Sequence, residues 1–294
     1  MPTDLWALLG AFPHALAAGV LIAMVCACLG VLVILKRVVF IGVTLAESAA
    51  LGVALSLSLG LPPLLGASLL SLAVVGLLSL PFQSARLPRE TLLGVIFVTA
   101  SSLAVLVVAG SGFGLHEVKT LLYGDLILTG PGDLALVAAV LLPLAGLLLL
   151  FRRPLFYTFL DREAARVLGI RVRAWELLFF ACLGLAISAS ARSAGSLLVF
   201  CYLVAPSSLG LLLSRSMGWA MLAAGASAVL GTLGGLALSL AVDLPANQTV
   251  AAVLAGLLAG AALARLLSGL RRPRGKQTDQ WKSGPGRPTH NARA

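Results

Sequence analysis

The chain has 294 residues, of which 60% are hydrophobic and 11% are charged, and its mean hydropathy is +1.04. Soluble domains are about half apolar and about a quarter charged, so this composition indicates an integral membrane protein. The formal net charge is +10, but the basic residues flank apolar segments and form no separate patch. This distribution favours contact with membrane lipid and argues against a nucleic-acid partner.

Long apolar segments follow one another along most of the chain, and each approaches the length that crosses about 30 Å of hydrocarbon. We place nine of them, at 14–35, 40–59, 64–80, 92–109, 133–151, 175–191, 195–213, 218–241 and 247–268. Irregular backbone cannot face lipid, so the sequence predicts an all-α, polytopic bundle of about nine transmembrane helices. Residues 1–270 are the predicted membrane domain, and the basic, Pro- and Gly-containing tail 271–294 is predicted to be disordered.

The positions of Lys and Arg predict the orientation of the chain. With the N-terminus outside and the C-terminus in the cytoplasm, all but two of the 21 basic residues, Lys119 and Arg192, lie on the cytoplasmic side. This is the bias of proteins in the bacterial inner (cytoplasmic) membrane. The sequence 247–249 fits a glycosylation sequon, but it adjoins a predicted span and is interpreted as a chance match.

One acidic residue, Glu47, lies inside the second predicted span, roughly 10 Å along the helix from Phe40. A charge at that depth costs about 3 kcal/mol on insertion scales, so such acids usually face a partner, a cavity or an ion path. Glu47 is therefore the first functional candidate. The alternative is a buried neutral acid that is hydrogen-bonded to Ser48 or to a backbone carbonyl.

Two further segments carry functional hypotheses. The loop 152–173 contains LDREAARVLGIRV, in which Asp161 precedes good helix formers and Gly169 follows them, so a short capped helix is predicted. Either a docking element or a solvated, lipid-contacting loop fits this pattern. Pro206 lies within the seventh span and predicts a kink, in either a packed inner helix or a gating helix.

Several kinds of chemistry have no motif in the chain. There is no G-x-x-x-x-G-K-[ST] loop, no H-E-x-x-H motif and no paired-cysteine metal motif, and the three histidines are scattered. No membrane histidine is placed to activate a serine nucleophile. We therefore expect a transport protein that is not itself an enzyme and binds no cofactor, with any ATP hydrolysis performed by another chain.

Four sequence segments together resemble one family. FIGVTLAESAALGVAL, the YGD that follows the fourth span, LDREAARVLGIRV and SAGSLLVFCYLVAPSSLGLLL are similar, in this order and spacing, to the permease subunit of metal-ion ABC importers of the zinc and manganese group. The resemblance implies import of a divalent metal ion, with zinc, manganese, iron and a metal chelate all open. It also implies a permease homodimer, two ABC ATPase subunits and an extracytoplasmic metal-binding protein.

The resemblance also implies roles for particular residues. The segment with Asp161, Glu163, Ala164 and Gly169 matches the coupling helix that sits in the ATPase, and Pro206 matches a kink that lets the gate bend.

The chain departs from the family at the ion path. Family members have Asp and His four residues apart in the second span, on one face of the helix, and the matching residues here are Val43 and Glu47. Two Glu47 carboxylates of a homodimer would form a weak site of hard oxygen ligands. Asp125 and Asp243 are candidate charges at the entrance. Two alternatives remain: an ion-coupled secondary transporter with Glu47 as its proton carrier, and a non-transporting subunit that has lost its metal ligands.

Overall fold

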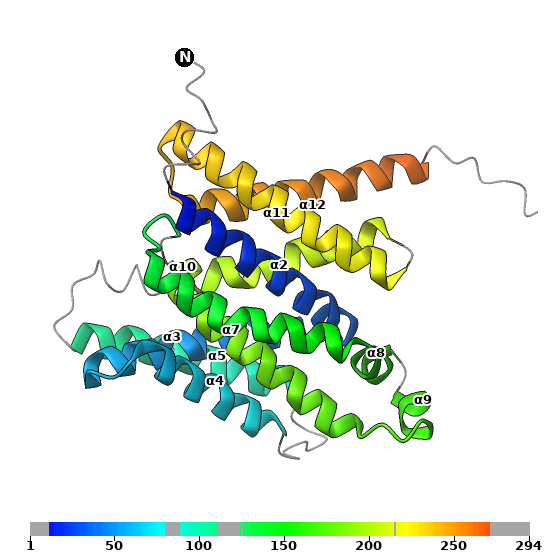
Figure 1. Ribbon diagram of the computed structural model, residues 1–294, viewed down its shortest axis with the longest axis horizontal. Coiled ribbons are helices and arrows are strands. Elements are labelled where there is room, and N and C mark those ends of the chain that lie inside the picture. The colour runs from blue at the N-terminus through cyan, green and yellow to red at the C-terminus, as the bar shows by residue number, and fades with distance from the viewer. Residues whose placement is uncertain are drawn as a thin grey trace, which may run out of the picture.

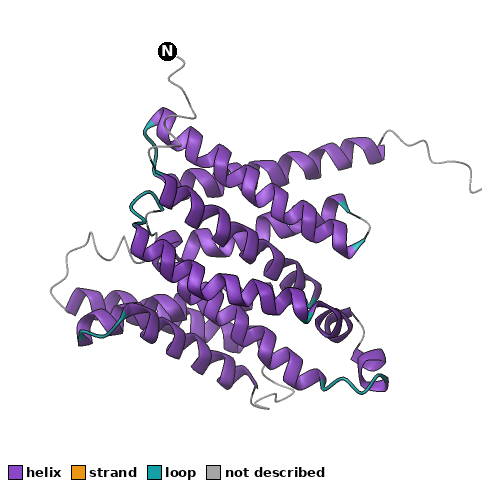
Figure 2. Cartoon of the chain, in the orientation of Figure 1, coloured by secondary structure: helices purple, strands orange, loops and turns teal. Residues whose placement is uncertain are grey.

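The computed structural model describes residues 12–79, 89–110, 124, 126–160, 162–214 and 216–270. Every regular element within these ranges is a helix (Figure 2). The helices are α2 (Pro13–Leu35), α3 (Val39–Leu59), α4 (Pro63–Ser79), α5 (Arg89–Gly110), α7 (Pro131–Leu150), α8 (Arg152–Leu160), α9 (Arg162–Val167), α10 (Val172–Leu213), α11 (Met217–Val242) and α12 (Ala246–Leu270). The predicted all-α membrane bundle is confirmed.

The nine predicted spans all coincide with helical segments of this bundle. Seven of the described helices are long and apolar enough to cross a membrane, and α4 is a shorter apolar helix of 17 residues. Helix α10 has 42 residues and would extend about 63 Å if it were straight, which is twice the hydrocarbon thickness. Its backbone leaves the helical region at Gly195 (φ 71°, ψ 160°), between the sixth and seventh predicted spans.

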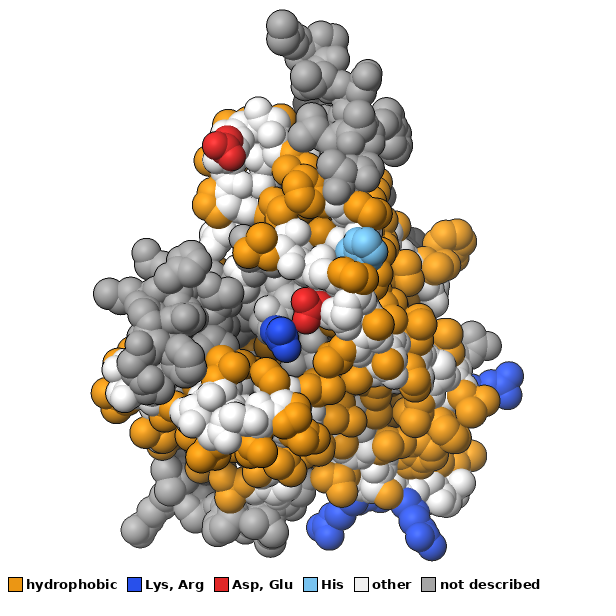
Figure 3. Space-filling model, turned by 60° about the vertical axis from the view of Figure 1, so that its left-hand side comes forward, with side chains coloured by type: hydrophobic (Ala, Val, Ile, Leu, Met, Phe, Trp, Pro, Cys, Tyr) orange, Lys and Arg blue, Asp and Glu red, His pale blue; other side chains and the backbone are white. Residues whose placement is uncertain are grey.

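The short helices α8 and α9 lie together at one end of the bundle (Figure 1). The last residues of α12 lie at this same end, whereas α2 begins at the opposite end. The start of α2 and the end of α12 therefore lie at opposite ends of the bundle. The surface in Figure 3 is mostly hydrophobic, and α12 is the least buried of the long apolar helices, as expected for a helix in contact with lipid or another protein.

Small residues let the central helices approach closely. A Cβ atom added to Gly52 of α3 would lie 2.2 Å from the carbonyl oxygen of Gly66 in α4. A Cβ atom on Gly30 of α2 would lie 1.9 Å from the carbonyl oxygen of Leu203 in α10. Close backbone approach at glycine is the usual way in which membrane helices pack, because lipid supplies no hydrophobic drive for helix association. These crossings bring α3 against α4 and the second half of α10 against α2.

Four parts of the chain that carry sequence predictions lie outside the described residues: the tail 271–294, Lys119, Asp125 and Asp161.

Candidate functional site at Glu47

Glu47 is buried on α3, with 9% of its surface exposed. The hydroxyl groups beside it on the helix bond to their own backbone: Thr44 donates to the carbonyl oxygen of Phe40 at 2.9 Å, and Ser48 donates to that of Thr44 at 2.7 Å. Such back-bonding is common for Ser and Thr inside membrane helices. Ser48 is therefore not the partner of the acid, so this part of the alternative hypothesis is wrong.

The partner of Glu47 comes from α10. Ser196 donates its hydroxyl proton to Oε1 of Glu47 at 3.0 Å, and this bond is buried. The other carboxylate oxygen, Oε2, is buried and has no hydrogen-bond partner among the described residues. Buried polar atoms are nearly always paired, so an unpaired carboxylate oxygen in the interior needs an explanation such as a water or an ion. Oε2 is the atom of this site that remains available to a cation.

The break in α10 determines where Ser196 lies. Gly195 adopts a positive φ that other residues rarely adopt, and Ser196 follows immediately after it. Gly124, which also has a positive φ, lies so close that a Cβ atom on it would be 2.4 Å from the backbone nitrogen of Gly195. Asn247 at the start of α12 donates from Nδ2 to the carbonyl oxygen of Ala194 at 2.9 Å, and its Oδ1 accepts from the backbone N–H of Leu126 at 3.2 Å.

The contacts of Gly124 and Asn247 at the break in α10, which we call the clamp, were not predicted from the sequence. Asn247 is buried, and its amide pairs with the carbonyl oxygen of Ala194 beside the break and with the backbone N–H of Leu126. A glycan on Asn247 would have no room, which agrees with the interpretation of the sequon as a chance match. The signal that the sequence offered was a polar amide next to a membrane span.

Val43 lies one helical turn before Glu47 and carries no donor atom, so α3 supplies a single carboxylate where two ligands were expected. Within the described ranges, no three His, Cys, Asp or Glu side chains lie close enough together to hold a metal ion. The residues of one chain therefore form at most part of a cation site at this point.

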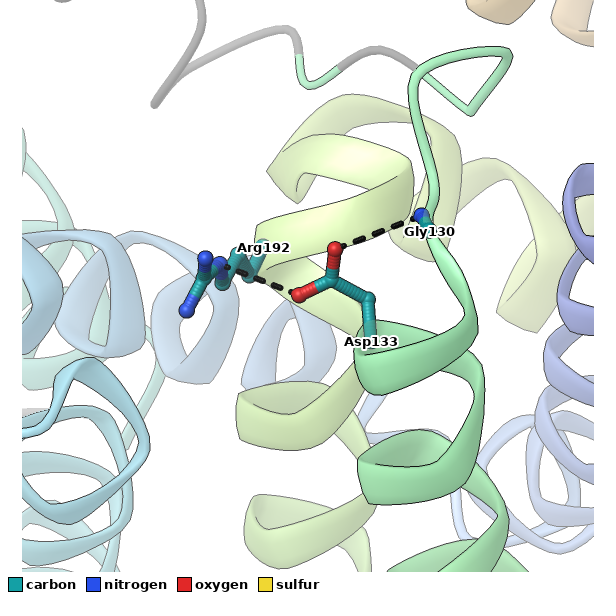
Figure 4. A network of polar contacts seen from close by, with 3 residues as sticks. All are labelled: Gly130, Asp133 and Arg192. Carbon is teal, nitrogen blue, oxygen red and sulfur yellow. Dashed lines mark hydrogen bonds and ion pairs between the residues drawn. The ribbon is translucent and has the colours of Figure 1, made fainter.

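The end of the bundle opposite α8 and α9 holds several charges. Asp243 is exposed and ends α11 in a left-handed conformation (φ 57°). Asp133, in the first turn of α7, accepts from the backbone N–H of Gly130 at 3.4 Å and lies 3.5 Å from Nε of Arg192 (Figure 4). Asp133 was not predicted, and its charge is balanced by one of the two basic residues that were predicted to lie outside.

Helix α9 forms within the predicted coupling segment, and it contains Glu163 and Ala164. Gly169 follows it with φ 75°, and the backbone N–H groups of Gly169 and Ile170 bond back to Arg166 and Ala165 at 3.0 and 2.9 Å. This is the usual glycine-dependent end of a helix. Val167 is 89% exposed and Leu168 is exposed too, so the helix presents apolar side chains outward.

Pro206 is buried in the second half of α10, where the backbone keeps helical angles. The hydroxyl of Ser207 donates to the carbonyl oxygen of Ala27 on α2 at 2.8 Å, and thus joins two helices instead of satisfying a carbonyl of its own helix. The sharp bend of α10 therefore lies at Gly195, which is eleven residues before the proline.

Membrane-length helices, a discontinuous helix beside a buried carboxylate, and a short exposed helix at one end define a polytopic membrane permease. The chain belongs to the ABC 3 transport family, whose model matches residues 11–265. Membership of a family of ABC transport proteins supports the ABC permease hypothesis and not the ion-coupled secondary transporter.

Several membrane transport proteins are similar to this chain over most of their length. The high-affinity zinc uptake system membrane protein ZnuB of Haemophilus influenzae is 28% identical over 81% of this chain and 91% of that protein. The manganese transport system membrane protein MntC of Halalkalibacterium halodurans is 23% identical over 84% of both chains. The solved structure of PsaBC from Streptococcus pneumoniae in complex with Fab has the same fold, with a TM-score of 0.80 and 19% identity, and covers 89% of this chain and 95% of that chain.

Proposed function

We propose that this chain is the membrane subunit of an importer for a divalent metal cation and that ATP hydrolysis in separate subunits drives the import. The observation that carries the proposal is the buried carboxylate of Glu47, in which Ser196 occupies Oε1 and Oε2 has no partner among the described residues. An acid inside a membrane helix usually belongs to an ion path. The relatives with matching length are named as zinc and manganese transport proteins, which supports a metal cargo.

Glu47 acts as a transient ligand of the transported cation. Carboxylate oxygens are hard ligands that suit manganese, whereas zinc prefers nitrogen or sulfur ligands. A homodimer would supply two Glu47 carboxylates, which together bind a divalent cation weakly enough for release. Val43 contributes no ligand, so the site favours transit over storage. Within the zinc, manganese and iron class, this ligand set favours manganese.

The partners follow from the two ends of the bundle. Val167 at the end of α9 and Leu168 just after it are exposed and apolar, and together with Glu163, Ala164 and Gly169 they fit a contact with one ATPase subunit per permease copy. The opposite end, with Asp243, would receive the cation from an extracytoplasmic metal-binding protein. This arrangement has the N-terminus outside and the C-terminus in the cytoplasm, in the inner membrane.

The test is uptake by the reconstituted complex of permease, ATPase and binding protein. Proteoliposomes that contain ATP are given Mn²⁺, Zn²⁺ or Fe²⁺ in turn, and the metal inside is measured. We expect Mn²⁺ to accumulate in an ATP-dependent manner, and we expect Glu47→Gln to reduce uptake at least tenfold while keeping the hydrogen bond from Ser196. Glu90→Gln removes an exposed acid and is the matched control.

Three results would overturn parts of the proposal. Uptake that follows a proton gradient without ATP would restore the secondary transporter. A wild-type complex that hydrolyses ATP and moves none of the three metals would contradict a metal cargo. Normal uptake by Glu47→Gln would remove Glu47 from the path.

A further inference from the structure

Lys36 ends α2 and contacts two other helices at the end of the bundle that carries α8 and α9. Its Nζ lies 2.7 Å from Oε1 of Glu176 in α10, and both side chains are largely buried, at 12% and 14% exposure. The same ammonium lies 5.0 Å from the ring centroid of Phe159 in α8 and 4.9 Å from that of Phe180 in α10. A cation held between two aromatic rings and a carboxylate is fixed more firmly than a surface ion pair.

Two aromatic rings, Phe159 near the end of α8 and Phe151 just before its start, pack against the first turns of α10. The ring centroids of Phe159 and Phe179 are 4.8 Å apart, and those of Phe151 and Trp175 are 5.1 Å apart. Helix α8 also leads directly into α9. A displacement of α9 would therefore reach α8 and, through Phe159, the ammonium of Lys36.

The turn after Lys36 passes such a displacement to α3. Arg37 has a φ of 58°, and the backbone N–H groups of Arg37 and Val38 bond back to Ile34 and Val33 at 2.9 and 3.3 Å. A left-handed non-glycine residue persists only where its surroundings hold it in place. Because α3 begins immediately after this turn, its position depends on that of Lys36.

The ion pair joins the end of α2 to α10, and α3, which begins three residues after Lys36, meets α10 again at the candidate site. From Val39, α3 rises about 12 Å to Glu47, and from Glu176, α10 runs about 30 Å to Ser196. Glu47 and Ser196 are hydrogen-bonded to each other. Lys36 thus restrains the start of α3 through the turn that follows it and the start of α10 through Glu176. The Glu47–Ser196 hydrogen bond joins the same two helices deeper in the bundle.

A cavity of about 1640 Å³ lies beside the Lys36 contact. Its walls include the start of α3 around Phe40 and the start of α10, with Glu176 and Phe180 among the lining residues. Phe200, one turn beyond Ser196, also lines it. The cavity therefore extends between the same two helices that Lys36 holds together.

We propose that Lys36 is a positioning residue that transmits movement of α8 and α9 to the Glu47–Ser196 pair, by holding the starts of α3 and α10 in one arrangement beside this cavity. The inference rests on the proposed function, because it assigns a task to Lys36 in the ATP-driven cycle. Lys36 does not touch the cargo. Its loss separates ATP hydrolysis from uptake.

The experiment measures ATP hydrolysis and Mn²⁺ uptake on the same reconstituted complexes. Lys36→Met keeps an apolar stem between the two rings and removes the charge, and we expect the number of ions imported per ATP to fall at least fivefold while ATP hydrolysis stays within twofold of wild type. Lys36→Arg keeps a cation and should restore the ratio to within twofold. Arg265→Met removes an exposed charge from α12, away from this turn and from the cavity lining, and should leave the ratio unchanged.

A double-variant cycle tests the contact itself. Glu176→Gln alone should lower the ratio, and adding it to Lys36→Met should lower it no further. If Lys36→Met does not yield a stable complex, Phe159→Leu provides the same test from the α8 side.

Equal losses of hydrolysis and uptake, restored when normalised to folded complex, would show that Lys36 only stabilises the fold and would overturn the inference. A wild-type ratio in Lys36→Met would also overturn it. If the wild-type complex moves no metal, the proposed function fails and the inference falls with it, whereas a wild-type ratio in Lys36→Met beside a transporting wild-type complex overturns the inference alone.

Discussion

Ser196 and Glu47 are 149 positions apart in the chain and meet in a buried hydrogen bond of 3.0 Å. Ser196 lies there because Gly195 breaks α10 just before it, and the break is held by Gly124 and Asn247. The candidate site thus depends on a backbone feature of α10 as much as on the acid itself.

Ser196→Ala should destabilise the permease and alter transport. The change leaves Oε1 of Glu47 buried without its donor, and a buried acceptor that loses its partner costs about 1–3 kcal/mol, with more for a charged group. We expect a lower thermal midpoint in detergent and a reduced uptake rate, with Ser196→Thr close to wild type in both. The control is Ser58→Ala, because Ser58 is exposed and bonds only within its own helix at 2.8 Å. An unchanged midpoint in Ser196→Ala would show that the bond contributes nothing.

Gly124→Ala should prevent correct folding around the break in α10. The added Cβ would lie 2.4 Å from the nitrogen of Gly195 and 2.7 Å from the carbonyl carbon of Ala194, and both are backbone atoms that cannot rotate away. Overpacking costs about 1–3 kcal/mol, and a left-handed conformation with a Cβ adds about 1–2 kcal/mol. Size-exclusion profiles of the solubilised protein should show loss of the monodisperse peak. Gly132→Ala, where the added atom meets open space, should behave as wild type.

The positions of the spans could be predicted because each is a long apolar segment, and hydrophobic length is a strong local signal. The division of α10 into two spans was visible as the gap between the segments 175–191 and 195–213, but the sequence did not show that the bend lies at Gly195. Pro206 attracted the prediction, whereas Gly195 is the residue at which the backbone angles of α10 leave the helical region.

The contacts of the candidate site could not be predicted, because each joins residues that are distant in the sequence. Glu47 was found because a charge inside an apolar segment is costly and therefore conspicuous. Ser196 and Asn247 are small polar residues of a kind that is common near spans, and only the folded chain shows which backbone or side-chain atom each of them meets.

Asn247→Leu should destabilise the break more than Asn247→Asp does. Leucine leaves both the carbonyl oxygen of Ala194 and the N–H of Leu126 unpaired, whereas an aspartic acid kept neutral by burial still accepts from Leu126 and can donate to Ala194. At about 1–3 kcal/mol for each unpaired buried group, the thermal midpoint should fall in the order wild type, Asn247→Asp, Asn247→Leu. Gln248→Ala, at the exposed neighbouring position, is the control. Equal midpoints for all four proteins would mean that the clamp is dispensable.

Val167→Glu tests whether α9 is the surface that meets the ATPase. Val167 is 89% exposed, so a glutamate there meets water in the isolated permease. It should change the free energy of unfolding by no more than about 0.5 kcal/mol. In the complex, the same charge would be buried against the partner without a counter-ion, which is costly. We therefore expect at least tenfold less ATPase to co-purify with the tagged permease. Gln248→Glu places the same charge at an exposed position near the start of α12, at the opposite end of the bundle, and should leave co-purification unchanged. Undiminished recovery of the ATPase with Val167→Glu would place the contact elsewhere.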